Sequence, residues 1–268
     1  MAKIIIIGGG AAGMAAAVFL GEQNHQVHLF EKNEKLGKKL FITGKGRCNI
    51  TNSCDEETFF QSVVSNPKFL YSAFYGYTNR DVIAFFESLG LAVKEERGGR
   101  IFPVSDHSSD VIKVLEQRMK ALDVKIHLKS RVEKVLTENS LEGEEKIRGV
   151  LLENGAEILA DRVIVATGGC SYQATGSTGD GYTFARETNH KVTELRPALV
   201  PIETKEEYVK DMQGLALKNV RFTVKDGKKV LYDDFGELLF THFGISGPLV
   251  LTASSRIGKK LEKKELQA

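Results

Sequence analysis

Three glycines near the start of the chain have the spacing of a dinucleotide-binding turn. Gly8, Gly10 and Gly13 form the pattern G-x-G-x-x-G directly after the apolar run 4–7. The first glycine permits a tight turn, the second lets backbone approach a pyrophosphate, and the third lets helix and strand touch. The free N–H groups at the start of the following helix favour phosphate. Glu31, eighteen positions after Gly13, is predicted to accept a hydrogen bond from a ribose hydroxyl.

A second glycine-rich region follows the apolar run 162–166. Residues 166–169 read Ala-Thr-Gly-Gly, and glycines at a strand end let the backbone come close to a dinucleotide. The alternative is an ordinary strand-to-loop turn. Asp180, within the sequence Thr-Gly-Asp-Gly at 178–181, precedes a predicted helix. It either contributes to the ligand site or serves only as a helix N-cap.

The composition describes an ordinary globular protein and gives little reason to expect a polyanionic partner. The chain has 268 residues, 42% of them hydrophobic and 27% charged, with a net charge of +2. The basic runs at 35–39 and 256–264 are interpreted as solvated faces, with membrane or nucleic-acid binding as the less favoured alternative. Three cysteines without metal-ligand spacing indicate reduced thiols in a cytoplasmic protein, with no metal site. No apolar stretch approaches the roughly 18 residues that a membrane span needs.

The elements that must position these residues predict an α/β fold with a parallel sheet and a β-meander. Helices are expected after the first glycine turn and over 56–64, 67–75, 79–89 and 109–122, the last with Ser108 or Ser109 as its N-cap. Strands are expected at 4–7, 26–30, 124–128, 131–137, 147–153, 157–159 and 162–166, with a hairpin turn at 154–155. Residues 33–54 are predicted to form a loop. Later strands are expected at 220–225, 229–232 and 238–241, and a helix-compatible tail at 256–268.

Several long motifs resemble those of the BaiN/aminoacetone-oxidase-type flavoproteins. They are Arg-Cys-Asn-Ile-Thr-Asn at 47–52 and the segments 96–103, 197–201 and 236–248. The Thr-Gly-Asp-Gly segment also resembles that of fumarate reductase and L-aspartate oxidase flavoproteins. The resemblance implies an FAD-binding protein with the two-part dinucleotide fold of the glutathione-reductase type. It places a Rossmann-type FAD-binding domain over 1–196 and the beginning of an inserted β-rich domain over 197–268.

The motifs and the resemblance together define the predicted site. Cofactor contacts are expected from Gly8, Gly10, Ala11, Ala12, Gly13, Glu31, Lys32, Lys38, Lys39, Gly44, Gly46, Arg47, Cys48, Asn49, Val132, Ala166, Thr167, Gly168, Gly169 and Asp180. His242 is the histidine best placed for acid–base chemistry, and Arg100 is a candidate for gripping an anionic substrate. The alternative for His242 is a structural role.

The loop over 43–52 suits a flavin. Its glycines bring N–H groups toward the ligand, and Lys45 and Arg47 supply positive charge, which raises the reduction potential of a flavin beside it. The alternative is a solvated basic loop. Cys48 and Cys54 are spaced C-x5-C, whereas disulfide reductases of this superfamily place a redox pair as C-x4-C. Small inert thiols are therefore preferred over a dithiol.

The first functional hypothesis is an FAD-dependent oxidoreductase that transfers hydride between the flavin and a small molecule. Reduction of a C=C or C=N bond and oxidation of an amine both fit, and NAD(P)H is a candidate transient electron donor. The second hypothesis is a flavoenzyme that reduces a base in structured RNA. The third is a piece that binds only FAD or its ADP half without catalysis, because the relatives are expected to continue beyond residue 268 with a closing strand.

Overall fold

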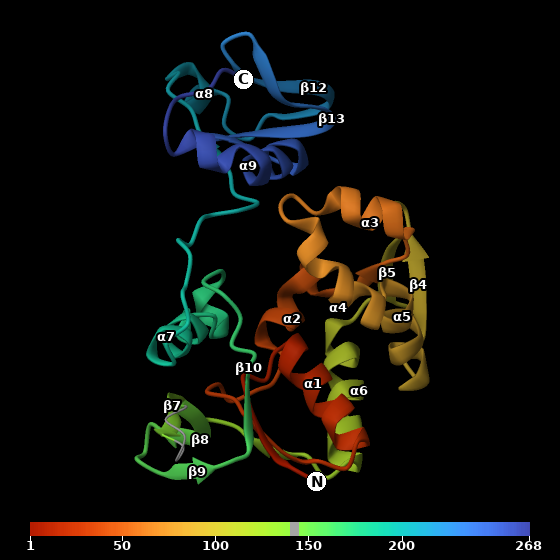
Figure 1. Cartoon of the computed structure of the whole chain (residues 1–268). Coiled ribbons are helices and arrows are strands. Elements are labelled where there is room, and N and C mark those ends of the chain that lie inside the picture. Colours follow the sequence, from red (N-terminus) through yellow and green to blue (C-terminus); the bar gives the residue numbers. More distant parts are fainter. Residues whose placement is uncertain (140–144) are drawn as a thin grey trace. The chain divides into compact units, whose positions relative to one another are not determined.

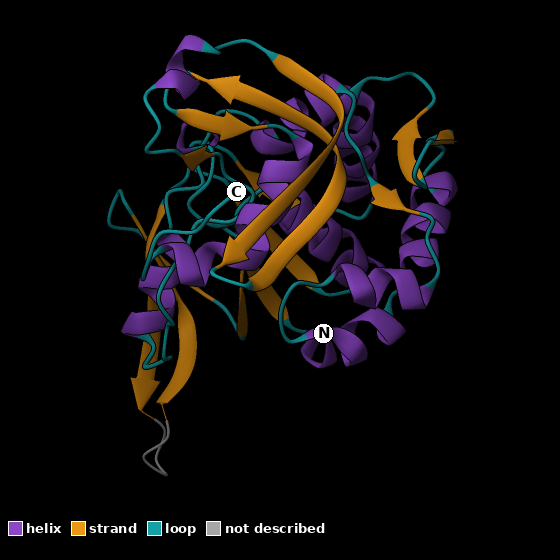
Figure 2. Ribbon diagram, turned by 90° about the horizontal axis from the view of Figure 1, so that it is seen from above, coloured by secondary structure: helices purple, strands orange, loops and turns teal. Residues whose placement is uncertain are grey.

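The computed structural model describes residues 1–139 and 145–268, which form two compact units. The first unit comprises residues 1–59 and 68–192, and the second comprises residues 60–67 and 193–268. Figure 1 labels their helices and strands, and Figure 2 distinguishes them by colour. The elements of the first half are β1 Lys3–Ile7, α1 Ala11–Glu22, β2 Gln26–Phe30, α2 Lys38–Ile42, the 3-10 turn η1 Thr43–Gly46, β3 Thr51–Asn52, α3 Glu56–Ser62, the 3-10 turn η2 Pro67–Leu70, α4 Tyr71–Gly76, α5 Asn79–Ser88, β4 Val93–Glu96, β5 Arg100–Pro103, α6 Ser108–Ala121 and β6 Lys125–His127.

The remaining elements include the two longest strands. They are β7 Val132–Asn139, β8 Glu145–Leu152, β9 Glu157–Leu159, β10 Arg162–Val165, the 3-10 turn η3 Gln173–Thr175, α7 Asp180–Glu187, β11 Ile202–Glu203, α8 Tyr208–Asp211, β12 Ala216–Asp226, β13 Lys229–Thr241, β14 Gly244–Ser246 and α9 Pro248–Leu261.

A four-stranded parallel sheet forms the centre of the first unit, in the order β10-β1-β2-β6. Its strands are apolar on both faces because both faces are covered. On one face, Ile6 packs with Met14 and Val18 of α1 and with Leu115 of α6. On the other face, Ile5 belongs to a core shared with the meander β7-β8-β9 and with α7. The predicted α/β fold with a β-meander is confirmed.

A small antiparallel sheet, β3-β5-β4, lies between the first βαβ unit and α6 in the chain. Of the region predicted as loop, this sheet contains β3, at residues 51–52. The prediction of a loop over 33–54 is wrong in part, because α2, η1 and β3 lie there. The predicted N-cap of α6 is also wrong. The helix begins at Ser108 after His107, because the Ser108 hydroxyl donates instead to the carbonyl of Phe41 at 2.6 Å.

The second unit is an antiparallel sheet in the order β11-β14-β13-β12, with α9 packed against it. Its core includes Phe222, Val224, Leu238, Val250 and Ala253. The strands expected separately at 229–232 and 238–241 form one strand, β13, which pairs along β12 with two irregularities of register. The predicted helical tail is confirmed as far as residue 261, beyond which Gln267 forms a bridge with Lys225.

Two histidines on neighbouring parallel strands form an edge-to-edge hydrogen bond. Nδ1 of His28 lies 3.1 Å from Nε2 of His127, and the His127 ring stacks on Phe30 at 4.4 Å. Burial, and then the positive charges of Lys3, His127 and Lys125, lower the pKa of His28. Burial also lowers the pKa of His127. The pair is therefore stable in the neutral state, because one ring nitrogen must accept.

The histidine pair predicts a loss of stability in acid. Because both folded-state pKa values lie below 6.5, stability from this pair is present above pH 6.5 and is lost as the pH falls through the folded values. Urea midpoints should fall between pH 7.5 and 5, and His28→Phe should reduce that fall. His107→Gln, an exposed control, should leave it unchanged. Equal pH dependence in the wild type and His28→Phe would contradict the assignment.

Candidate functional site

The glycine turn between β1 and α1 brings three segments into close contact. A Cβ on Gly13 would lie 1.9 Å from the carbonyl oxygen of Gly8. A Cβ on Gly8, whose φ is +109°, would lie 2.5 Å from the carbonyl oxygen of Ala166. Gly10 differs from both, because a Cβ there would have no heavy atom within 4 Å. Gly8 and Gly13 therefore allow packing, whereas Gly10 borders open space.

That open space is a cavity of about 850 Å³ in the first unit. It lies at the carboxyl ends of β1, β2 and β10, which is where open α/β sheets bind ligands. The start of α1 faces it without a side-chain N-cap, so the first-turn N–H groups are available to a phosphate. The size and position suit a nucleotide cofactor.

Fifteen of the predicted cofactor residues line this cavity, namely Gly8, Gly10, Ala11, Ala12, Glu31, Lys32, Lys38, Lys39, Cys48, Asn49, Val132, Ala166, Thr167, Gly168 and Asp180. Five others, Gly13, Gly44, Gly46, Arg47 and Gly169, do not line it. Residues that lie far apart in the sequence, between positions 8 and 180, are thus brought together. The wall also includes Gly9, Asn33, Arg131, Thr175 and Ser177, which the motifs did not indicate.

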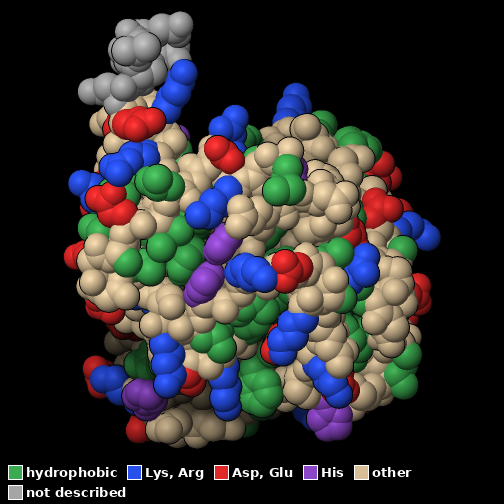
Figure 3. Space-filling model, turned by 90° about the horizontal axis from the view of Figure 1, so that it is seen from below, with side chains coloured by type: hydrophobic (Ala, Val, Ile, Leu, Met, Phe, Trp, Pro, Cys, Tyr) green, Lys and Arg blue, Asp and Glu red, His purple; other side chains and the backbone are tan. Residues whose placement is uncertain are grey.

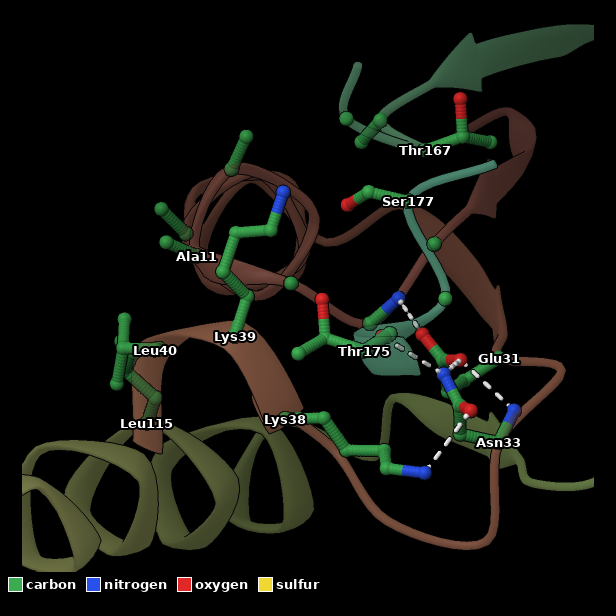
Figure 4. A pocket seen from close by; sticks show the side chains of 18 of the residues that line it. Ala11, Glu31, Asn33, Lys38, Lys39, Leu40, Leu115, Thr167, Thr175 and Ser177 are labelled. Atoms are coloured by element: carbon green, nitrogen blue, oxygen red, sulfur yellow. Dashed lines mark hydrogen bonds between the residues drawn. The ribbon is translucent and has the colours of Figure 1, made fainter. Parts of the chain in front are cut away.

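Glu31 is the centre of a hydrogen-bond network at the end of β2. Its side chain is buried and accepts bonds from the N–H of Gly9 at 2.7 Å, and from the backbone and side-chain N–H groups of Asn33 at 2.8 and 2.6 Å. Asn33 in turn donates to the carbonyl of Thr175 at 3.2 Å (Figure 4). The carboxylate is held in a fixed position beside the cavity.

Two lysines that follow β2 in the chain, Lys32 and Lys39, connect this region to residues 171–180. Nζ of Lys32 donates to Thr178 at 2.6 Å and to Asp180 at 2.8 Å. Burial disfavours the charged form of Asp180, but the hydrogen bonds from Lys32 and Thr178 outweigh it and lower its pKa. Nζ of Lys39 donates to the hydroxyl of Ser171 at 3.1 Å. Because this hydroxyl is neutral, it does not compensate the positive charge of Lys39.

Arg47 does not line the cavity. Its guanidinium hydrogen-bonds to Glu96 and Asp106, and lies 4.3 Å from the centre of the Phe102 ring. Cys48 and Asn49, the next two residues, do line the cavity. Cys48 is buried, and burial raises the pKa of its thiol. Cys48 and Cys54 are both free thiols in the structure.

The two predicted catalytic residues lie outside the cavity wall. The Arg100 side chain donates to the carbonyl of Arg97 at 3.1 Å and lies 5.8 Å from the Phe102 ring centre. His242 belongs to the second unit, where its ring contacts Phe243 edge-on at 4.8 Å. A catalytic role for either residue stays a prediction.

The cavity extends into an apolar lobe that the sequence motifs did not indicate. We define this lobe by the lining residues Ala15, Phe19, Ile50, Tyr77, Val82, Phe85 and Phe86. The Phe19 ring stacks on Phe85 and meets Tyr77 edge-on, both at 5.1 Å. Burial, followed by the charges of Asp81 and Glu22, raises the pKa of Tyr77. The signal in the sequence is the second apolar stripe of α1, at positions 12, 15 and 19.

With this geometry described, comparison with known proteins identifies the family. The family model described as "HI0933-like protein Rossmann domain" matches residues 2–255. The chain is a member of the HI0933-like family. The predicted resemblance to a family of FAD-binding flavoproteins with a Rossmann-type domain is confirmed. The cofactor of this chain is FAD.

Curated relatives of the family carry two different activities in their names. The chain is 36% identical over 270 residues to "3-dehydro-bile acid delta(4,6)-reductase" of Clostridium scindens, covering 100% of this chain and 63% of the relative. It is 34% identical over 253 residues to "Ribosomal RNA dihydrouridine synthase" of Haemophilus influenzae, covering 94% and 60%. The chain thus spans about three-fifths of the length of these relatives.

The fold is also similar to that of a solved structure. The crystal structure of THI4 from Thermovibrio ammonificans matches with a TM-score of 0.52 at 14% identity, covering 95% of this chain and 79% of that chain. At this identity the likeness concerns the fold alone. Within the described residues, no helix is long and apolar enough to cross a membrane.

The residues of the site fit FAD. The space beside Gly10 accommodates a pyrophosphate next to the free N–H groups of α1. The carboxylate of Glu31 stands at the end of β2, where a ribose hydroxyl donates in this fold. Lys39, which donates to the neutral hydroxyl of Ser171, adds positive charge for the phosphates.

Gly10→Val should remove FAD while leaving the chain folded. The new side chain would enter the open space beside α1, where a Cβ has no protein atom within 4 Å, and it would displace the pyrophosphate. The flavin absorbance per mole of purified protein measures the effect. Gly258→Val in α9, where a Cβ would also meet no atom closer than 3.9 Å, is the matched control and should keep its flavin. Normal flavin content in Gly10→Val would refute the placement.

Glu31→Ala should weaken FAD binding by about 1.5–3 kcal/mol, the range for a hydrogen bond to a charged group. Calorimetric titration of the flavin-free protein measures the affinity. Glu157→Ala is the control, because Glu157 is exposed and pairs with Arg148, and neither residue lines the cavity. Urea unfolding of both variants separates lost affinity from lost stability. Unchanged affinity in a folded Glu31→Ala would show that this carboxylate does not touch the cofactor.

Proposed function

We propose that this protein is an FAD-dependent oxidoreductase acting on a largely apolar small molecule with a ring system. The observation that carries the proposal is the apolar lobe, which is continuous with the nucleotide cavity. A wall of aromatic and aliphatic side chains favours an apolar ring system as ligand. The name of the relative from Clostridium scindens, a bile acid reductase, supports the same class of substrate.

Distinct parts of the chain would hold the two halves of FAD. The N–H groups at the start of α1 and the Glu31 carboxylate would bind the ADP half. Thr43, Cys48 and Asn49 would lie beside the flavin ring, since they line the cavity and are close in the sequence to the apolar lining residue Ile50. FAD, when bound, supplies hydride transfer. The protein would orient a conjugated C=C bond next to the ring and exclude water from it.

Three side chains of the lobe would determine how the substrate lies beside the flavin ring. Phe19 and Phe85 stack on one another, so their rings form a rigid wall of the lobe. Tyr77 supplies a hydroxyl that stays protonated at neutral pH, since burial raises its pKa. It can therefore donate a hydrogen bond to a substrate carbonyl and polarise an enone. Among the described residues, the Tyr77 hydroxyl makes a long hydrogen bond of 3.4 Å to the carbonyl of Asp81.

A substitution that fills the apolar lobe with a larger side chain tests the proposed class of substrate. The wild-type protein, photoreduced without oxygen, should be reoxidised by a planar enone such as progesterone, with return of the oxidised-flavin absorption band. Ala15→Phe should bind FAD normally but lose about 10-fold or more in reoxidation rate, because the new ring would occupy the lobe. Ala84→Phe, on the exposed face of α5, is the matched control and should behave as wild type. Equal rates in Ala15→Phe and wild type would overturn the placement.

The alternative function is reduction of a base in structured RNA. It is favoured by the relatives named ribosomal RNA dihydrouridine synthase, which are 34% and 31% identical to this chain. On the face shown in Figure 3, Lys and Arg side chains are intermixed with Asp and Glu, so that face offers no uniformly basic docking surface. Reoxidation by structured RNA but not by enones, with binding that weakens steeply as salt rises, would favour this alternative.

A further inference from the structure

The loop over 43–48 has a backbone that its own sequence does not favour. Gly44, Lys45, Gly46 and Cys48 all have left-handed φ values, of 56°, 59°, 85° and 60°. Glycine adopts this region freely, but Lys45 and Cys48 carry a Cβ that opposes it. Such a conformation persists only where the surroundings enforce it, and it is common at functional sites.

The side chain that can enforce it is Arg47, between the two strained positions. Its Nε donates to Oδ1 of Asp106 at 2.9 Å, and Nη2 reaches the same oxygen at 2.6 Å. Nη1 and Nη2 also bond the two carboxylate oxygens of Glu96. The planar fork of an arginine fixes direction in a way that a lysine does not.

Further contacts fix the partners of Arg47. Nζ of Lys94 donates to the second oxygen of Asp106 at 2.6 Å. The guanidinium lies over the Phe102 ring of β5, the strand next to β4. The hydrogen bond from Arg47 lowers the pKa of Glu96, and those from Lys94 and then Arg47 lower that of Asp106, so both partners are charged at neutral pH.

These contacts also neutralise the arginine. Two cations, Arg47 and Lys94, face two carboxylates, Glu96 and Asp106, so the cluster carries no net charge. The cluster is therefore a poor source of positive potential for a ligand. Its geometry instead fixes the backbone from which Cys48 and Asn49 reach the cavity.

We propose that Arg47 is a positioning residue, whose ion pairs with Glu96 and Asp106 hold the strained 43–49 loop in the shape that receives the flavin ring. The proposal rests on FAD binding and on the assignment of this loop to the flavin half of the cavity. It does not depend on the substrate or on the direction of the redox reaction.

A comparison of the affinities for FAD and for ADP, its half without the flavin, separates this role from the alternatives. Arg47→Lys keeps the positive charge but loses the planar, forked guanidinium, so it should weaken FAD binding about 10-fold. The affinity for ADP should stay within about 2-fold of wild type, because ADP is bound by the turn after β1 and by Glu31. Asp106→Asn should give the same pattern. Arg221→Lys, which alters an exposed Arg–Asp pair of the second unit, is the matched control. Calorimetry with FAD and with ADP, on flavin-free protein, measures both affinities.

Each other outcome overturns the proposal. Wild-type FAD affinity in Arg47→Lys together with lost affinity in Arg47→Gln would show that Arg47 acts through its charge. A parallel loss of FAD and ADP affinity, with a lower denaturation temperature, would show a general structural role. Unchanged affinities in all variants would show that the loop is not a flavin contact. These binding results stand whether or not an enone is reduced, so failure of the proposed function is distinguishable.

Discussion

The site depends on one steric constraint: there is no room for a side chain at Gly8 or Gly13, in the turn that connects β1 to α1. The contacts of Gly8 with the backbone at Ala166 and of Gly13 with Gly8 are closer than any Cβ tolerates. They hold α1, β1 and β10 together so tightly that the first turn of the helix opens directly onto the cavity. A larger residue would move the helix away from the sheet and would remove the phosphate-binding N–H groups from this position.

Around this turn, most charged side chains pair with other protein groups. Lys32 pairs with Asp180, Lys38 with Glu34, and Arg47 with Glu96 and Asp106. These pairs tie distant segments together, and surface ion pairs of this kind contribute little stability each. Their importance lies in geometry, because they fix the segments that form the cavity wall. Recognition of the cofactor is left mainly to backbone groups and to the carboxylate of Glu31.

The cavity has two chemically different regions, and α1 borders each of them with different residues. The face with Met14, Ala17 and Val18 packs on the sheet, and the N-terminal turn meets the nucleotide region. The stripe with Ala15 and Phe19 borders the apolar lobe. Small residues at 12 and 15 leave this space open. One helix thus serves the fold, the cofactor and the proposed substrate.

The sequence by itself determined the β1-α1-β2 unit and the meander, because strong local patterns specify them. The motifs together with the family resemblance indicated fifteen residues that line the cavity. Glycine spacing, apolar periodicity and the Asn-Gly turn act over short stretches of chain. Local patterns failed at Ser108, where a tertiary bond to Phe41 replaced the N-cap, and over 33–54. Only the tertiary structure decided the environment of Arg47. Its carboxylate partners lie 49 and 59 positions away in the chain, so residue type alone suggested a positive charge facing the flavin. In the folded chain Glu96 and Asp106 neutralise that charge, and this pairing is the basis of the positioning role proposed for Arg47.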